Sequence, residues 1–80
     1  MWYTYVLKSQ KDNHMYIGIS ENPEERLKQH NSGMTKSAKG RRPFVIVYKE
    51  LRKDRKDARN REKYLKSGIG REFLKMIMPL

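Results

Sequence analysis

One carboxylate in the second half of the chain interrupts an apolar helical stripe. Glu62 lies four residues after Ala58 and three before Leu65, so helical spacing places it on the same face as these two apolar residues. Burying a carboxylate without a partner is costly. Glu62 is therefore expected either to pair with a cation or to hold a metal ion.

Two phenols and two basic side chains in the first half could join the same chemistry. Tyr5 and Tyr16 fall in segments rich in β-branched and aromatic residues, where alternation allows both to share one sheet face. Arg26 and His30 are four apart and are neighbours if the segment is helical. A guanidinium binds two phosphate oxygens, whereas a phenol needs nearby positive charge to lower its pKa of about 10 before it can act as a base. We expect that charge to come from Arg26, Lys8 and a metal ion.

Composition favours a polyanionic partner. The chain has 19 Lys and Arg against 9 Asp and Glu, a formal net charge of +10. DNA is the first candidate and RNA the second, and no apolar run is long enough to suggest a membrane partner. A basic surface that serves only solubility is the plain alternative. Because there is no cysteine, thiolate metal sites and cysteine nucleophiles are excluded, and any metal must rest on oxygen or nitrogen ligands.

Residue patterns predict an α+β domain that spans residues 1–80. Residues 2–8 and 15–19 read as an antiparallel hairpin, and residues 44–50 as a third, buried strand. The N-terminal segment lacks the pattern of a secretory signal, so a cytoplasmic protein is expected.

Three helices should flank this sheet. Asn22 and Pro23 are a strong helix start, and that helix should run to about Asn31. A second helix should begin after Asp54, with Ala58, Leu65 and Ile69 on its inner side and Gly68 as its C-cap. A third, residues 70–78, should offer Phe73, Leu74 and Ile77 to the core.

The small, polar and basic segment 32–43 should be an exposed loop that meets phosphate groups. The residues expected to bind substrate are Lys8, Gly18, Lys36, Lys39, Arg41 and Arg42.

The ordered set of site residues resembles the GIY-YIG endonuclease superfamily. Tyr3-Thr4-Tyr5 is followed after ten residues by Tyr16-Ile17-Gly18, then by Arg26 and His30, then by Glu62. The similarity runs from end to end and is greatest to the small, stand-alone bacterial branch. The first motif departs from the family pattern, because Tyr3 stands in place of the glycine and Thr4 in place of the isoleucine.

This resemblance implies an α/β sandwich with a three-stranded antiparallel sheet and a metal-dependent endonuclease. Glu62 would be the sole protein ligand of one Mg²⁺ or Mn²⁺ ion, Tyr16 or Tyr5 would activate water, and Arg26 would contact the phosphate, with His30 assisting. The products would carry a 5′ phosphate and a 3′ hydroxyl, and one domain would nick one strand, in a context such as DNA repair or recombination. A partner protein could supply specificity, whereas the sequence does not define the oligomeric state.

Plainer interpretations stay open. The two tyrosines could be a cross-strand aromatic pair, the arginine and histidine solvated surface residues, and Gly18 a bulge or a point of substrate approach. Glu62 could form an ion pair with Lys66 worth only ~0.3 to 0.5 kcal/mol. The alternative function is a nucleic-acid-binding adaptor that keeps the fold and does not cut.

Overall fold

Three antiparallel strands form one sheet in the order β2-β1-β3. The computed structural model describes residues 1–33 and 39–77. Its elements are β1 (Trp2–Ser9), β2 (Met15–Ser20), α1 (Pro23–Asn31), a 3-10 turn (Lys39–Arg41), β3 (Phe44–Arg52), α2 (Arg55–Lys66) and α3 (Gly68–Ile77). The predicted α+β class and three-stranded sheet are confirmed.

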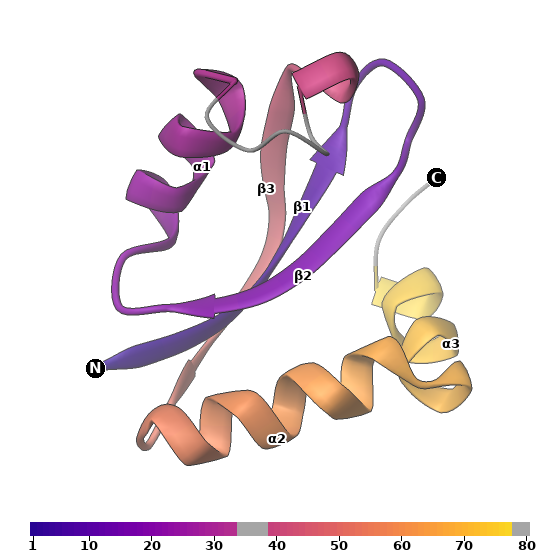
Figure 1. The fold of residues 1–80 in the computed structure, drawn as a ribbon. Helices are drawn as coiled ribbons and strands as arrows, with labels where there is room; N and C mark the ends of the chain where they lie inside the picture. The colour runs from indigo at the N-terminus through magenta and orange to yellow at the C-terminus, as the bar shows by residue number, and fades with distance from the viewer. Residues whose placement is uncertain (34–38, 78–80) are drawn as a thin grey trace.

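Helices cover both faces of this sheet (Figure 1). On the α1 side, Tyr5, Leu7 and Phe44 form a buried cluster against which Leu27 packs. On the other side, Val6 packs with residues of α2 and α3. Successive β1 residues thus serve opposite layers, as the twofold alternation of a strand requires.

The register of the hairpin places the Tyr3-Thr4-Tyr5 segment beside the Tyr16-Ile17-Gly18 segment. Tyr5 pairs with Gly18 and Leu7 with Tyr16, without a shift between β1 and β2. The irregularity in the sheet lies instead between β1 and β3, at Val6 and Leu7. The expectation of a bulge at Gly18 is therefore wrong.

Both predicted helix starts are confirmed. The side chain of Asn22 accepts a hydrogen bond from Glu25 N, with Pro23 in the first helical turn. The side chain of Asp54 accepts one from Asp57 N at the start of α2.

The C-terminal helices differ from the expectation in their junction. Ser67 caps α2, and Gly68 begins α3 two residues earlier than predicted. As a result Ile69 is 73% exposed and does not continue the inner stripe of α2. Within α3, Leu74 is fully buried, whereas Ile77 is 41% exposed rather than a core residue.

A buried hydrogen bond ties α2 to the sheet. Thr4 Oγ1 donates to the carbonyl of Ala58 at 2.8 Å, and both residues are fully buried. Because Thr4 precedes Tyr5 and Ala58 lies one turn before Glu62, this contact fixes α2 next to the site-bearing strand. Among the described residues, no helix has both the length and the apolar character needed to cross a bilayer.

Candidate active site

The structure brings together four of the predicted site residues. Tyr5, Gly18, Arg26 and Glu62 line one cleft of about 290 Å³. They come from β1, β2, α1 and α2, so the cleft gathers groups from both sides of the sheet. Four further residues of its wall are Trp2, Ile19, Arg55 and Arg59.

The absence of a side chain at Gly18 leaves room for the Tyr5 phenol. A Cβ atom at Gly18 would lie 2.7 Å from Tyr5 Oη and 2.9 Å from Cζ, both closer than van der Waals contact allows. The phenol therefore lies across the backbone of β2, which only a residue without a side chain permits. Gly18 also lines the cleft, and Tyr5 is the group that approaches its backbone in this structure.

Burial raises the pKa of Tyr5. The residue is only 5% exposed, and loss of solvation is the largest cause of the shift. The positive charge of Arg26 lowers this pKa and the negative charge of Glu62 raises it. The expected lowering by Arg26 is present, but burial outweighs it, so the net shift of the Tyr5 pKa is upward.

Glu62 is buried and paired with two cations. The residue is 6% exposed. Its Oε1 accepts a hydrogen bond from Arg59 Nη1 and its Oε2 one from Lys66 Nζ, each at 3.0 Å. Both cations are more than half exposed, so they cap the carboxylate from the solvent side. The predicted Lys66 pair is confirmed, and Arg59 adds to it.

Positive charge dominates the rim of the cleft. Arg26 is exposed, and its Nη1 donates to Gln29 Oε1 at 3.1 Å. The Arg55 guanidinium lies over the Trp2 ring, 5.6 Å from its centroid. With Arg59, three guanidinium groups line a cleft that holds one carboxylate, an arrangement suited to an anionic ligand.

Tyr16 and His30 lie beside the cleft and are not among its described lining residues. Tyr16 is two residues from Gly18, about 7 Å along β2. Its ring meets those of His30 and Phe44 edge-on, with centroids 5.6 and 5.4 Å away. His30 Nδ1 donates to the carbonyl of Arg26 at 3.0 Å, so the histidine braces the helix turn that carries the arginine.

The predicted substrate-binding residues occupy several different places. Lys8 follows Thr4 and Val6 in alternation and therefore projects from the α2 side of the sheet, away from the Tyr5 phenol.

Arg41 Nε pairs with Asp12 at 2.9 Å, and its Nη1 donates to Tyr16 Oη at 3.3 Å. Lys36 and the side chain of Lys39 lie outside the described residues. Arg42 is exposed, with its Nη1 3.5 Å from the Asn31 carbonyl.

Sequence reasoning missed Arg55 and Arg59. Arg59 precedes Glu62 by three residues, a spacing that places both on one helix face. That signal could have singled it out. Trp2 and Arg55 offered no such spacing, because only the fold brings the start of β1 to the start of α2.

The site fits a divalent metal ion bound by one carboxylate. The described residues hold no group of three or more His, Cys, Asp or Glu side chains placed to share a metal. Mg²⁺ keeps most of its waters and is commonly held by one or two carboxylates and substrate phosphates. A buried glutamate that opens onto a basic cleft meets that requirement.

The fold and the site define a known class of catalytic domain. Residues 1–72 match the family model described as the GIY-YIG catalytic domain. The chain therefore belongs to the GIY-YIG family. This membership supports a nuclease-type function on nucleic acid, and nucleases of this family generally use divalent metal ions.

Within that family, the chain is similar to bacterial UPF0213 proteins. A relative from Staphylococcus haemolyticus is 41% identical over 94% of this chain and 92% of its own length. Another from Clostridium perfringens is 38% identical over 96% of this chain and 83% of its own length. The solution structure of a UPF0213 protein from Bacillus halodurans has a TM-score of 0.56 at 30% identity, and covers 96% of this chain and 85% of that one.

The departures from the first family motif have structural reasons. Thr4 faces α2, where its hydroxyl bonds Ala58, so a polar residue is satisfied in a buried position. Tyr3 lies under Lys49 Nζ, 5.5 Å from the ring centroid.

Proposed function

We propose that this protein is a divalent-metal-dependent endonuclease that nicks one strand of DNA, with RNA as the second candidate substrate. The observation that supports this proposal is one cleft in which a buried carboxylate, a phenol and three guanidinium groups meet. The net charge of +10 supplies the long-range attraction for a polyanion.

Each side chain has a distinct part in the proposed hydrolysis. Arg26 binds two oxygens of the scissile phosphate and stabilises the charge of the pentavalent state. In its ionised form, Tyr5 Oη accepts the proton of a water that attacks phosphorus in line. The bond from phosphorus to the 3′ oxygen breaks, and that oxygen takes a proton from solvent, which leaves a 5′ phosphate and a 3′ hydroxyl.

Glu62 is the proposed metal ligand. Its carboxylate would hold a divalent ion, which would supply positive charge to the phosphate and to the leaving oxygen. Tyr5 is preferred over Tyr16 as the base because Tyr5 lines the same cleft as Glu62. The edge-on contact between the Tyr16 and His30 rings is proposed to help position Tyr5.

Nicking of supercoiled plasmid tests this assignment. With Mg²⁺ or Mn²⁺, the wild type should nick, whereas Glu62→Gln and Tyr5→Phe should each lose at least about a hundredfold in rate. Glu25→Gln, which removes an exposed acid on α1 outside the cleft, is the matched control and should nick normally. Metal-dependent nicking that survives Glu62→Gln would refute the site.

A nucleic-acid-binding adaptor that does not cut is the second candidate. It is favoured by the two ion pairs that occupy Glu62 and by the raised pKa of Tyr5, which keeps the phenol protonated. In that case binding weakens steeply with salt and is unaffected by metal or by Glu62→Gln. Binding that ignores salt would argue against it.

A further inference from the structure

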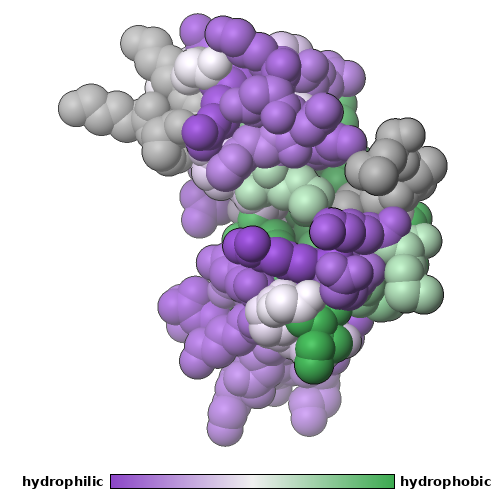
Figure 2. All heavy atoms as spheres, turned by 90° about the vertical axis from the view of Figure 1, so that its right-hand side faces the viewer, coloured by the Kyte–Doolittle hydropathy of each residue, from purple (hydrophilic) through white to green (hydrophobic). Residues whose placement is uncertain are grey.

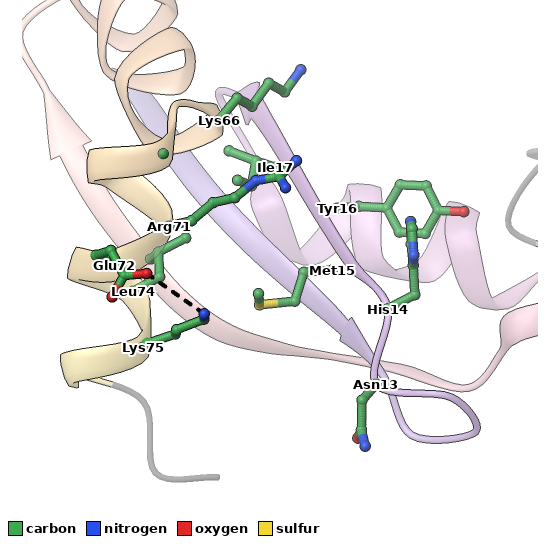
Figure 3. A pocket seen from close by; sticks show the side chains of 11 residues that line it. Asn13, His14, Met15, Tyr16, Ile17, Lys66, Arg71, Glu72, Leu74 and Lys75 are labelled. Carbon is green, nitrogen blue, oxygen red and sulfur yellow. Dashed lines mark ion pairs between the residues drawn. The ribbon is translucent and has the colours of Figure 1, made fainter.

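A second hollow, of about 700 Å³, lies between β2 and α3 (Figure 3). We call it the β2–α3 groove. Its apolar lining comes from Met15, Ile17 and Leu74, and its cations are Lys66, Arg71 and Lys75. The surface on this side of the molecule shows the same combination, with hydrophobic atoms between hydrophilic areas (Figure 2). A hollow of this size can hold more than a single ion or water.

Of the three groove cations, Lys66 is paired with Glu62, whereas Arg71 and Lys75 have little to neutralise them. Arg71 has no acidic partner in the described part of the chain, and Lys75 lies 3.6 Å from Glu72 in a pair that is mostly exposed. Such a pair contributes little and can exchange partners. Arg71 and Lys75 are four residues apart, so they project from one face of α3 toward the same hollow.

The groove adjoins the catalytic cleft. Ile17 lines the groove, and Ile19, two residues further along β2 and therefore on the same face, lines the cleft. Lys66 lines the groove and donates to Glu62, which lines the cleft. A polymer that crosses the cleft along β2 therefore passes directly into the β2–α3 groove.

The two walls of the groove suit the two parts of a nucleotide. Figure 3 shows Arg71, Lys66 and Lys75 on the helical side, with Met15 and Ile17 between them and the β2 backbone. Cations meet backbone phosphates, whereas an apolar floor accepts base faces that are not already stacked. In a duplex those faces are hidden, so a duplex could use the cations but not the floor.

We propose that the β2–α3 groove binds unpaired nucleotides that adjoin the cleaved phosphate. The substrate class is then nucleic acid with a single-stranded segment next to the cleavage position. This inference rests on the proposed function, which makes the cleft the place where the phosphodiester is cut. Charge argues against a second copy of the chain as the occupant, because each copy carries +10.

Fluorescence anisotropy in a Glu62→Gln background tests the groove without cleavage. The ligands are a single-stranded oligonucleotide, a fork with one single-stranded arm, and a blunt duplex of the same sequence. Arg71→Gln with Lys75→Gln should weaken binding of the first two about tenfold or more and reduce the salt slope by roughly 0.7 per cation. Blunt-duplex affinity should fall less than single-strand affinity, because a duplex reaches the cations but not the apolar floor.

The matched control is Lys28→Gln with Lys63→Gln, which removes the same charge from exposed positions outside both hollows. Thermal melts establish that all variants fold. Equal losses in the two double variants, or equal losses on single-stranded and duplex ligands, would overturn the groove. A wild-type dimer that Arg71→Gln with Lys75→Gln dissociates would also overturn it. None of these results affects the plasmid test, which depends on Glu62 and Tyr5.

Discussion

Glu62 is a buried charge whose solvation has been replaced by two ion pairs. Removing a carboxylate from water costs several kcal/mol unless opposite charges compensate. Arg59 and Lys66 supply that compensation at 3.0 Å each. They also occupy the side of the carboxylate from which a metal cation or a phosphate would arrive. Arg59 and Lys66 therefore compete with a metal cation and attract a phosphate.

Removing these two cations should change metal and nucleic-acid affinity in opposite directions. Arg59→Gln with Lys66→Gln should tighten Mn²⁺ binding about tenfold, because two repulsive charges disappear. It should weaken oligonucleotide binding and lower the salt slope. Calorimetry measures the first effect and anisotropy the second. Weaker metal binding in this variant would contradict the competition, and Lys28→Gln with Lys63→Gln controls for net charge.

Even the smallest side chain at position 18 should destabilise the protein. Gly18→Ala places a methyl group against Tyr5 Oη and Cζ, so the buried ring must shift. We expect a loss of about 1–3 kcal/mol in the free energy of unfolding, together with loss of nicking. Urea denaturation measures the first.

Because the ring is the obstacle, Tyr5→Ala should cancel most of the additional cost of Gly18→Ala in a double-mutant cycle. Additive losses would show that the ring is not the cause.

At the scale of elements, α3 rests on the end of α2 at Gly70. A Cβ there would overlap the Tyr64 carbonyl oxygen, with the Leu65 backbone close behind. Gly70→Ala should therefore cost about 3 kcal/mol or more, because α3 and its buried Leu74 must move away from the sheet.

Gly68 offers the matched control for this helix. A Cβ at Gly68 meets nothing within 4 Å. Gly68→Ala should be neutral or stabilise the protein by up to about 1 kcal/mol, because alanine restricts the unfolded chain. Thermal melts compare the two variants, and equal destabilisation would refute the close packing at Gly70.

The sequence predicted the elements where local signals agreed. Asn22-Pro23 and Asp54 marked helix starts through capping, and β-branched runs marked all three strands. The α2–α3 junction was misjudged because Gly68 resembles a C-cap, although Ser67 fills that position and Gly68 opens the next helix.

The site was predictable to the extent that it follows an ordered motif. Tyr5, Arg26 and Glu62 do meet, and Gly18 lines the same cleft. Arg55 could not be found, because its place depends on the crossing of β1 and α2 rather than on spacing. The direction of the Tyr5 pKa shift was missed because burial depends on packing that no single segment reveals.

At the scale of the whole molecule, alkaline pH should unfold the protein through its buried phenols. Burial raises the pKa of both Tyr5 and Tyr48. The folded state then holds protons that the unfolded state has lost, so this stability is complete below pH 10 and declines as pH rises through the folded pKa values.

Denaturant titrations at pH 7 and above pH 10 measure this loss. Tyr5→Phe should lose less stability over that interval than the wild type, because one titrating phenol has been removed. Tyr64→Phe is the control, since Tyr64 is 38% exposed. An unchanged alkaline loss in Tyr5→Phe would contradict the role of its burial.

The hydrogen bond from Thr4 to Ala58 sets the alignment of the two halves of the site. The residue after the donor carries the phenol, and the acceptor lies one helical turn before the carboxylate. A sliding of α2 along the sheet by a fraction of a turn would leave most apolar contacts intact yet separate these groups. The Thr4 hydroxyl thus fixes the position of α2 along β1. Where the family pattern has isoleucine, this chain has a directional hydrogen bond that holds the basic helix α2 in register with the strand.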